Sequence, residues 1–499
     1  AAVFPESPEA AASGRVTASA NPDFGDFQCN DAMALSKILR MPPRAIADKI
    51  VSGASFPGII KKIEIAGPGF INLTLDDAFI AERAAAIAAD PQVGVPQCGA
   101  GQTIVVDYSS PNVAKPMHIG HIRSTIIGAA IDKLHRALGY HVLSDNHIGD
   151  WGTQFGIIIM GYRHFVDQQK LAEAPASELE RVYVQSYGQA KDDEAWMNQC
   201  RAELVKLQQG DPENLALWKE FIRLSLVEFN RVYGRLGIHF DMTRGESHYQ
   251  DALAGIVDRL EKAGLAKESE GATVVDLSDE DLGVCIVRKS DGGFNYATTD
   301  LATVDSRVRE FSPEKIVYVT DERQQLHFKQ FFSICRKTGI APEAVDLVHV
   351  WFGLMRLPEG TFSTRQGNVI KLDVLLDEAE TRALAVIKAS RPDLPEAEAK
   401  TLAAQIGISA VKYADLSQDP RTLITFTWEK ALALDGNSGP YLQYAYARIR
   451  SVRGKYKEQF PGIDPDKQPL LLGDEIERTL ALKLALFPSA VKKAALSYR

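Results

Sequence analysis

Two histidines separated by two residues, His118 and His121, are the side chains in this sequence best placed for chemistry on an anion. They follow an apolar run at 103–106 and a loop with Pro111 and Pro116, and a helical pattern of apolar residues comes next. A strand, a tight loop and a helix N-terminus in this order form a phosphate cradle, because the backbone N–H groups and the helix dipole point at the anion. Two imidazoles there can bind triphosphate oxygens that gain charge in a transition state.

Two other interpretations of the histidine pair stay open: two residues on a half-buried helix face, or an incidental metal-binding pair. The context favours phosphate, because the prolines keep the loop from becoming helical before His118. Gly120 lacks a side chain, and we expect it to let a nucleotide approach the backbone closely.

Length and composition predict an enzyme of several domains without a membrane segment. The 499 residues, 45% hydrophobic and 24% charged, suffice for about three domains. No apolar stretch reaches the length of a membrane span and the N-terminus lacks a signal pattern, so we expect a cytoplasmic protein. The five cysteines include no Cys-x-x-Cys pair, which argues against a disulfide framework and a structural metal.

The formal net charge of −9 argues against a general binder of polyanions but leaves room for a local basic surface. Such a surface is predicted in segment 441–460, where tyrosines alternate with Arg448, Arg450, Arg453, Lys455 and Lys457. RNA contact and a solvated helix face are the two interpretations of this segment.

Three domains are predicted from the order of the patterns. Residues 1–95 form a small α+β unit with helices at 31–39 and 43–51 and strands at 59–65 and 70–75. Residues 102–370 form a parallel sheet wrapped by helices, with strands at 103–106, 141–143, 315–319 and 345–351 and a helical insertion at about 165–265. Residues 371–499 are all-helical, with helices at 374–390, 396–413, 437–457 and 475 to the end. The last helix lacks a C-cap glycine, so we expect the natural chain to be longer.

Several motifs, in order, resemble those of the arginyl-tRNA synthetases, a family of class I aminoacyl-tRNA synthetases. The most extensive is Asp-Tyr-Ser-Ser-Pro-Asn-Val-Ala-Lys-Pro-Met-His-Ile-Gly-His-Ile-Arg at 107–123. The others lie at 66–72, 146–156, 295–300, 324–328, 415–417 and 436–445. The resemblance implies an α/β fold: a Rossmann-like catalytic domain with an N-terminal α+β domain that binds tRNA and a C-terminal helical domain that binds the anticodon arm.

The resemblance also implies the reaction, in which ATP with Mg²⁺ activates L-arginine to an adenylate and arginine is then transferred to tRNA(Arg). His118 and His121 are expected to hold the triphosphate, with Gly120, His349 and Gly353 completing the ATP site. The arginine pocket is expected to contain Asp107, Ser110, Asn112, His121, Tyr296, Asp300 and Gln324. A structural metal is not expected.

Within that pocket, Asp300 is the first choice for the guanidinium, since a planar cation with five donors needs carboxylates placed for parallel hydrogen bonds. Tyr296 is expected to close over the aliphatic stem, and Asp107 and Asn112 to hold the α-amino group. The alternative for Asp300 is a helix N-cap, and for His349 a core histidine. Lysine leaves buried acceptors unpaired, so we expect no editing domain.

One departure from the family pattern concerns the loop that usually reads Lys-Met-Ser-Lys, whose lysines neutralise the departing pyrophosphate. Here residues 361–368 read Thr-Phe-Ser-Thr-Arg-Gln-Gly-Asn, without either lysine. We hypothesise that Lys115 and Arg365 supply the charge; the alternative is that both are solvated loop residues.

The resemblance suggests RNA contacts by Tyr444, Tyr446, Arg450 and Arg453 in the helical domain and by Phe70 and Asn72 in the N-terminal unit. Core positions are the alternative for the tyrosines and for the strand at 70–75. The segment 150–152 is expected to form the other wall of the cleft; the alternative is a turn with a buried tryptophan. A monomer is expected.

Two alternatives to an arginine-specific enzyme remain: another class I synthetase and a catalytically silent relative. A cysteine-specific relative is disfavoured because no zinc-like Cys/His set is present.

Overall fold

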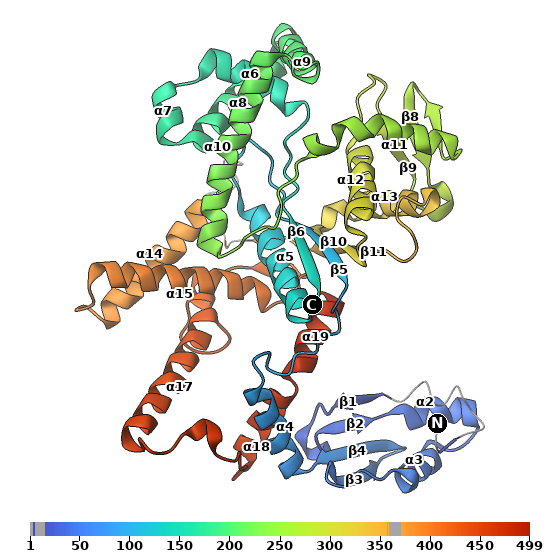
Figure 1. Ribbon diagram of the computed structural model, residues 1–499, viewed down its shortest axis with the longest axis vertical. Coiled ribbons are helices and arrows are strands. Elements are labelled where there is room, and N and C mark those ends of the chain that lie inside the picture. Colours follow the sequence, from blue (N-terminus) through green and yellow to red (C-terminus); the bar gives the residue numbers. More distant parts are fainter. Residues whose placement is uncertain (1–2, 5–14, 357, 359–370) are drawn as a thin grey trace. The chain divides into compact units, whose positions relative to one another are not determined.

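The computed structural model describes residues 3–4, 15–356, 358 and 371–499, which divide into two compact units (Figure 1). One unit comprises Ala1–Pro96 and Lys457–Lys493, and the second comprises Gln97–Tyr456 and Ala494–Arg499. No helix of the described ranges is long and apolar enough to span a bilayer.

The second unit is built on the predicted parallel sheet, whose four strands have the order β11-β10-β5-β6. Its strands are β5 (Thr103–Tyr108), β6 (His141–Asp145), β10 (Lys315–Asp321) and β11 (Asp346–Phe352). Because every strand runs the same way, their carboxyl ends meet at one edge, where ligands bind in open α/β sheets.

Alternate residues of the central strands face two separate cores. Ile104 and Val106 pack with α5 (Ile119–Ala137), whereas Val105 packs with α11 (Gln250–Lys262), α12 (Tyr296–Phe311) and α13 (Gln325–Thr338). Both faces of the sheet are therefore covered, which explains why its strands read as continuous apolar runs.

The predicted insertion is helical and is followed by a small antiparallel sheet that the sequence analysis missed. The helices from 154 to 236 are α6 (Gln154–Phe165), α7 (Gln168–Glu173), α8 (Pro175–Asp192), α9 (Glu194–Gln208) and α10 (Pro212–Leu236). The sheet has the order β7-β8-β9, with β7 (Ala266–Ser269), β8 (Ala272–Asp276) and β9 (Val284–Arg288). Glu270 and Gly271 both have positive φ in its first turn. Glutamate seldom adopts that conformation, so the hairpin carries a weak sequence signal.

Beyond residue 371, the second unit contains α14 (Leu372–Ser390), α15 (Glu396–Leu416), α16 (Trp428–Ala431) and α17 (Gly439–Gln459) up to Tyr456. A short parallel pair, β12 (Met355–Arg356) with β13 (Ile424–Thr425), was not predicted. The predicted last helix is two helices, α18 (Glu475–Ala485) and α19 (Phe487–Ser497). Pro488 explains the break, because proline lacks the N–H that a continuous helix needs and is tolerated in a first turn.

The first unit contains the strands and helices predicted for the N-terminal segment, and also two strands before residue 30 and a helix after residue 76 that were not predicted. Its sheet has the order β1-β2-β4-β3, with β1 (Val16–Ala18), β2 (Phe27–Cys29), β3 (Ile60–Ala66) and β4 (Phe70–Leu75), and its helices are α2 (Asp31–Leu39), α3 (Pro43–Gly53) and α4 (Asp77–Ala89). Arg478 of α18 donates to the carboxylates of Asp26 and Asp77 at 2.7 Å each, which ties α18 to this unit.

A buried ion pair joins the histidine-bearing helix α5 to the helices after residue 371. The Nε of Arg123 donates to Asp415 Oδ1 at 3.0 Å, and both side chains are 1% exposed. Arg123 Nη1 also donates to the carbonyl oxygens of Gly353 and Thr422. One guanidinium thus fixes α5, α15 and the segments after β11 and before β13.

We expect Arg123→Met to lower the free energy of unfolding in urea by about 3–5 kcal/mol, because it leaves Asp415 buried without its cation. Lys133→Met on the exposed side of the same helix is the matched control and is expected to cost less than about 0.5 kcal/mol. Equal losses for the two variants would contradict a structural role for the ion pair.

Candidate active site

The two histidines cap the N-terminus of α5 through a reciprocal pair of hydrogen bonds. His118 is the N-cap residue, and its Nδ1 accepts from Gly120 N at 3.0 Å. His121 Nδ1 accepts from His118 N at 3.1 Å, and the ring centroids are 3.9 Å apart. The two rings are therefore held side by side at the positive end of a helix dipole.

These contacts fix the protonation state of both rings. A nitrogen that accepts an N–H carries a lone pair, so each neutral imidazole has its proton on Nε2. Burial, with the charges of Arg323 and Lys115, lowers the pKa of His118. Burial, with the neighbouring His118, lowers the pKa of His121 to about 3. Near neutral pH both rings are uncharged and present an Nε2–H donor.

Gly120 has a different structural explanation from the one expected. A Cβ at this position would lie 2.8 Å from His118 Cε1 and 2.9 Å from its Nδ1. The missing side chain thus allows the His118 ring to fold back over the helix terminus and cap it.

The loop after β5 is strained and heavily hydrogen-bonded. Ser109, Ser110 and Ala114 have φ values of 72°, 48° and 62°. The Oγ of Ser109 lies 2.9 Å from the hydroxyl of Tyr233, and Ser110 N donates to Asn146 Oδ1 at 3.2 Å. Non-glycine residues with positive φ persist only where the surroundings impose them, which is frequent at functional sites.

Asp107, expected to hold the α-amino group, already has an internal partner on each carboxylate oxygen. Arg307 Nη2 of α12 donates to Asp107 Oδ2 and to Asp145 Oδ2, both at 2.7 Å. Ser110 Oγ donates to Asp107 Oδ1 at 3.0 Å, and Asp107 is 6% exposed. These contacts favour a positioning role for Asp107 over direct contact with a ligand.

The first turns of α12 carry the two side chains expected around a guanidinium. Asn295 caps the helix by accepting from Tyr296 N, so the N-cap alternative for Asp300 is wrong. Asp300 lies one turn after Tyr296, which is 70% exposed. His327 Nε2 lies 2.6 Å from Asp300 Oδ2. Burial lowers the pKa of His327, but the contact with this carboxylate outweighs burial, so the pKa is raised overall.

Sequence reasoning missed Glu246, at the start of a 3₁₀ turn (Glu246–Tyr249). Burial, with the charges of Asp300 and Asp150, raises the pKa of Glu246 to about 8. Asp150 is 5% exposed and accepts from the backbone and hydroxyl of Ser247. No motif marks Glu246; only folding brings it beside Asp300.

Three further candidates are Asn112, Gln324 and Lys115. Asn112 and Gln324 are exposed, and Asn112 forms a parallel bridge with Gly149. Lys115 Nζ lies 4.8 Å from the ring centroid of Tyr183 of α8, and burial lowers the pKa of this lysine. Its effect on the pKa of His118 supports a position near the histidine pair.

The two residues expected near adenine have structural partners in the second unit. His349 lies 2.8 Å from Thr320 Oγ1 and stacks on Phe328 at 4.0 Å, and burial, with the charge of His327, lowers its pKa to about 4. Gly353 donates to Pro420 O, and a Cβ there would lie 2.8 Å from Thr422 O. Close packing is therefore sufficient to explain Gly353. Arg365 and most of the segment around it lie outside the described residues.

The candidate RNA contacts differ in accessibility. Tyr444 and Tyr446 of α17 are 51% and 65% exposed, which argues against the core alternative for them, and Arg450 and Arg453 are exposed. Asn72 is 6% exposed and accepts from Gln28 Nε2 at 2.8 Å, which favours the sheet-interior alternative. Phe70 is half-buried.

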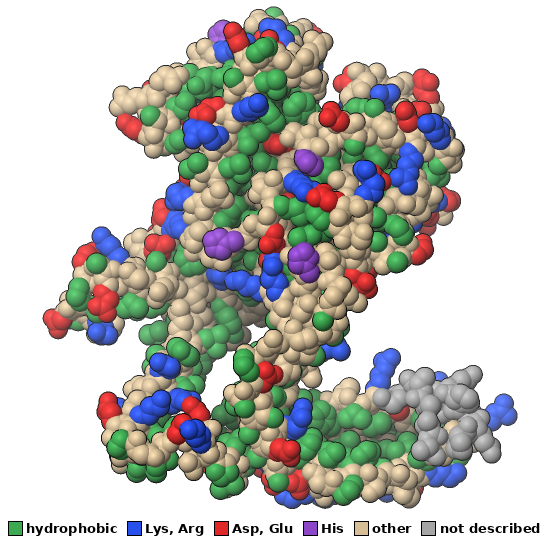
Figure 2. All heavy atoms as spheres, viewed as in Figure 1, with side chains coloured by type: hydrophobic (Ala, Val, Ile, Leu, Met, Phe, Trp, Pro, Cys, Tyr) green, Lys and Arg blue, Asp and Glu red, His purple; other side chains and the backbone are tan. Residues whose placement is uncertain are grey.

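Basic and acidic side chains are interspersed on the face drawn in Figure 2. In the part of the chain that the structure describes, no three His, Cys, Asp or Glu side chains are grouped to hold a metal ion.

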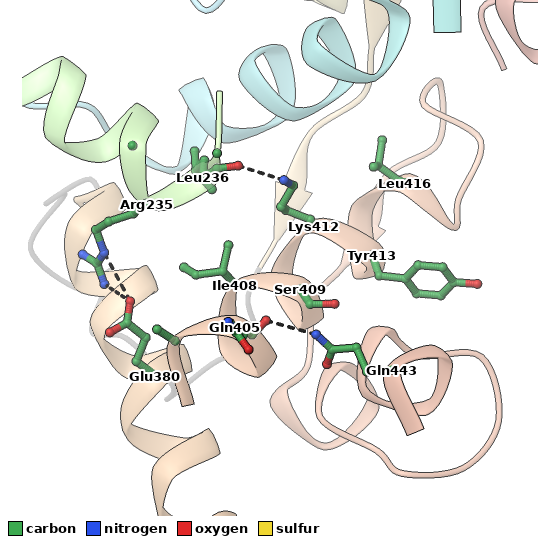
Figure 3. Close-up of a pocket in the computed structure, with 13 residues that line it drawn as sticks. Arg235, Leu236, Glu380, Gln405, Ile408, Ser409, Lys412, Tyr413, Leu416 and Gln443 are labelled. Carbon is green, nitrogen blue, oxygen red and sulfur yellow. Dashed lines mark hydrogen bonds and ion pairs between the residues drawn. The ribbon is translucent and has the colours of Figure 1, made fainter. Parts of the chain in front are cut away.

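A cavity of about 610 Å³ lies where α10, α14, α15 and α17 meet (Figure 3). Its walls include the Arg235–Glu380 ion pair and Lys412, which donates to Leu236 O at 2.8 Å. None of the candidate residues named above lines it.

Comparisons with known proteins agree over almost the whole chain. Residues 84–428 match the catalytic domain of class I tRNA synthetases (R), residues 3–75 the arginyl tRNA synthetase N-terminal domain, and residues 442–499 the DALR anticodon binding domain. An arginine–tRNA ligase of Fusobacterium nucleatum subsp. nucleatum is 44% identical over 97% of this chain and 84% of its own. One from Laribacter hongkongensis is 43% identical over 96% and 84%.

A solved structure also matches. The crystal structure of arginyl-tRNA synthetase from Plasmodium falciparum has a TM-score of 0.81 at 27% identity, over 99% of this chain and 86% of that chain. The similarity therefore covers fold and sequence together.

We expect His121 not to titrate between about pH 6 and pH 8 in the free protein, and the pKa of His118 to lie below its ordinary value, because burial favours the neutral ring. Carbon-13 NMR of the imidazoles measures this, and His118→Asn and His121→Asn assign the signals. A midpoint near the ordinary 6.5 for His121 would contradict the buried, capped geometry.

Proposed function

The chain belongs to the arginyl-tRNA synthetase family of class I, and from this premise we propose how its residues divide the work of the reaction. The enzyme is an arginine–tRNA ligase: it activates arginine with ATP to an arginyl-adenylate, releasing pyrophosphate, and transfers arginine to the 3′ end of tRNA, releasing AMP. The observation that carries the proposal is the pair of uncharged imidazole donors that His118 and His121 form at the N-terminus of α5.

His118 and His121 stabilise the negative charge that moves from the α-phosphate toward pyrophosphate. Their Nε2–H groups are left as donors because both Nδ1 atoms accept hydrogen bonds at the helix terminus. Donors fixed before the reaction need no reorganisation as charge develops, and one such donor typically contributes about a hundredfold or more in rate. Lys115, and Arg365 as proposed from the sequence, neutralise the leaving pyrophosphate. Mg²⁺ enters with ATP on the phosphate oxygens.

Asp300 and Glu246 receive the guanidinium of the substrate. The pKa of Glu246 is raised because its charge is buried beside Asp300 and Asp150, and a bound cation removes that penalty. Tyr296, an exposed ring one turn before Asp300 on α12, covers the aliphatic stem. Lysine presents one point charge in place of a planar fork, so it leaves acceptors unpaired in the same pocket. The helical insertion is therefore not needed for editing.

The remaining contacts divide between positioning and recognition. Asp107 positions Ser110 and the strained loop rather than holding the substrate amine. Asn112 and Gln324 hold the α-amino and carboxylate groups at the rim, and His349 and Gly353 support the adenine side. For tRNA(Arg), the exposed Tyr444, Tyr446, Arg450 and Arg453 contact the anticodon arm, and Phe70 contacts tRNA from the N-terminal unit. We propose that the enzyme acts as a monomer in the cytoplasm.

We expect exchange between ATP and radiolabelled pyrophosphate with arginine alone among the standard amino acids, and only when tRNA is present. Charging of tRNA(Arg) with arginine is expected under the same conditions. Lysine is expected to be discriminated against by about 10⁴-fold, because polar groups left unpaired in a buried site cost several kcal/mol. Exchange with a different amino acid would contradict the pocket assignment, and no exchange with any amino acid would indicate a silent relative.

A further inference from the structure

His327 of α13 contacts Asp300 of α12 and has no part in the reaction as described above. The two helices lie side by side (Figure 1), and His327 Nε2 is 2.6 Å from Asp300 Oδ2. The nitrogen donates to a carboxylate that can only accept, so Nε2 carries a proton in both the neutral and the charged ring. In the described part of the chain, no other group donates a hydrogen bond to Asp300.

Aromatic neighbours fix the ring of His327. Its centroid is 5.3 Å from that of Phe331 and 5.7 Å from that of Phe328, and both phenylalanines are buried. Both in turn contact the ring of Tyr318 in β10, Phe331 at 5.7 Å and Phe328 at 5.2 Å between centroids. The core of the second unit therefore positions the imidazole, although 31% of the His327 side chain is exposed.

The contact restricts the rotation of the Asp300 carboxylate. The terminal torsion of an aspartate is broad, so an unrestrained carboxylate presents its oxygens in many directions. A donor held by packing fixes Oδ2 and, with it, the plane of the group. A guanidinium donates through parallel N–H groups in one plane and depends on this orientation, whereas an ammonium donates in several directions.

The residue type at position 327 also suits a pocket for a cation. Burial lowers the pKa of His327, but the hydrogen bond and the charge of Asp300 raise it overall. A guanidinium bound to Asp300 opposes that effect of the carboxylate, so the ring can release its proton and remain a neutral donor. A lysine or an arginine at this position would stay charged and would repel the substrate.

We propose that His327 is a positioning residue that favours arginine over point-charged amino acids by fixing the orientation of the Asp300 carboxylate, an inference that rests on the proposed function. His327 acts through Asp300 and does not touch the substrate. Selectivity for arginine then depends on the restraint of an acceptor as well as on its charge. Groups held by their own hydrogen bonds and packing keep the geometry that a directional ligand needs.

The test measures arginine-dependent exchange between ATP and pyrophosphate in the presence of tRNA, with lysine as a competitive inhibitor. We expect His327→Leu to raise the KM for arginine about tenfold and to change kcat by less than about twofold, because the lost restraint weakens binding in the ground and transition states alike. The inhibition constant of lysine is expected to stay unchanged, since an ammonium does not depend on the carboxylate plane.

Two polar variants and a control separate the hydrogen bond from packing. His327→Gln places an amide donor near the position of Nε2 and is expected to keep the arginine KM within about threefold of the wild-type value. His327→Asn is too short to reach Asp300 and is expected to behave like His327→Leu. Lys329→Ala, at an exposed position on the same helix, is the matched control and is expected to change neither constant.

Three results would overturn the proposal. The first is an equal loss of affinity for arginine and lysine in His327→Leu, which would mean that the ring only supports the pocket. The second is no change for either ligand. The third, which also decides the matter if His327→Leu does not fold, is the same arginine KM for His327→Gln and His327→Asn. A wild-type chain without arginine-dependent exchange would instead refute the proposed function.

Discussion

Carboxylates gathered at the carboxyl ends of parallel strands repel one another unless cations neutralise them, and the placement of those cations decides what the site can bind. Arg307 neutralises Asp107 and Asp145, which face each other in register on β5 and β6. Asp300 pairs with His327, whereas Glu246 forms no ion pair with any of the described residues. A resident arginine thus occupies one group of acids, and we propose that the guanidinium of the substrate binds the other.

A single helix connects the two groups of acids. Asp300 and Arg307 lie two turns apart on α12, so they project from the same side of the helix. Arg307 is 1% exposed and lies 5.4 Å from the ring centroid of Tyr318 on the neighbouring strand. The buried ion pairs therefore fix Asp300, the proposed guanidinium acceptor, relative to the strand ends. Because removal of Arg307 leaves two buried carboxylates unpaired, this position tolerates little variation.

Much of the fold could be predicted because its signals are local. Apolar runs marked the strands of the parallel sheet, and apolar periodicity marked α5 and α15 within a few residues of their ends. The hairpin at 266–276 was missed because Glu270 in a left-handed turn has no sequence signature, and the break before α19 was missed because Pro488 sits inside a helical pattern. Glu246 was missed for another reason: its chemistry arises from its distance to Asp300, which no spacing in the sequence encodes. The engagement of Asp107 by Arg307, 200 residues away, is equally a product of folding.

The central claim is that an arginine side chain enters a pocket whose carboxylates are held ready for a delocalised cation. Isothermal titration calorimetry of arginine and of its neutral isostere citrulline, in buffers of different ionisation enthalpy near pH 7, tests it most directly. Because the pKa of Glu246 is raised to about 8 in the empty site and a bound cation lowers it, the account predicts that arginine binds with release of protons. It also predicts that citrulline binds at least about a hundredfold more weakly. Equal affinities for the two ligands, with no buffer dependence for arginine, would contradict it.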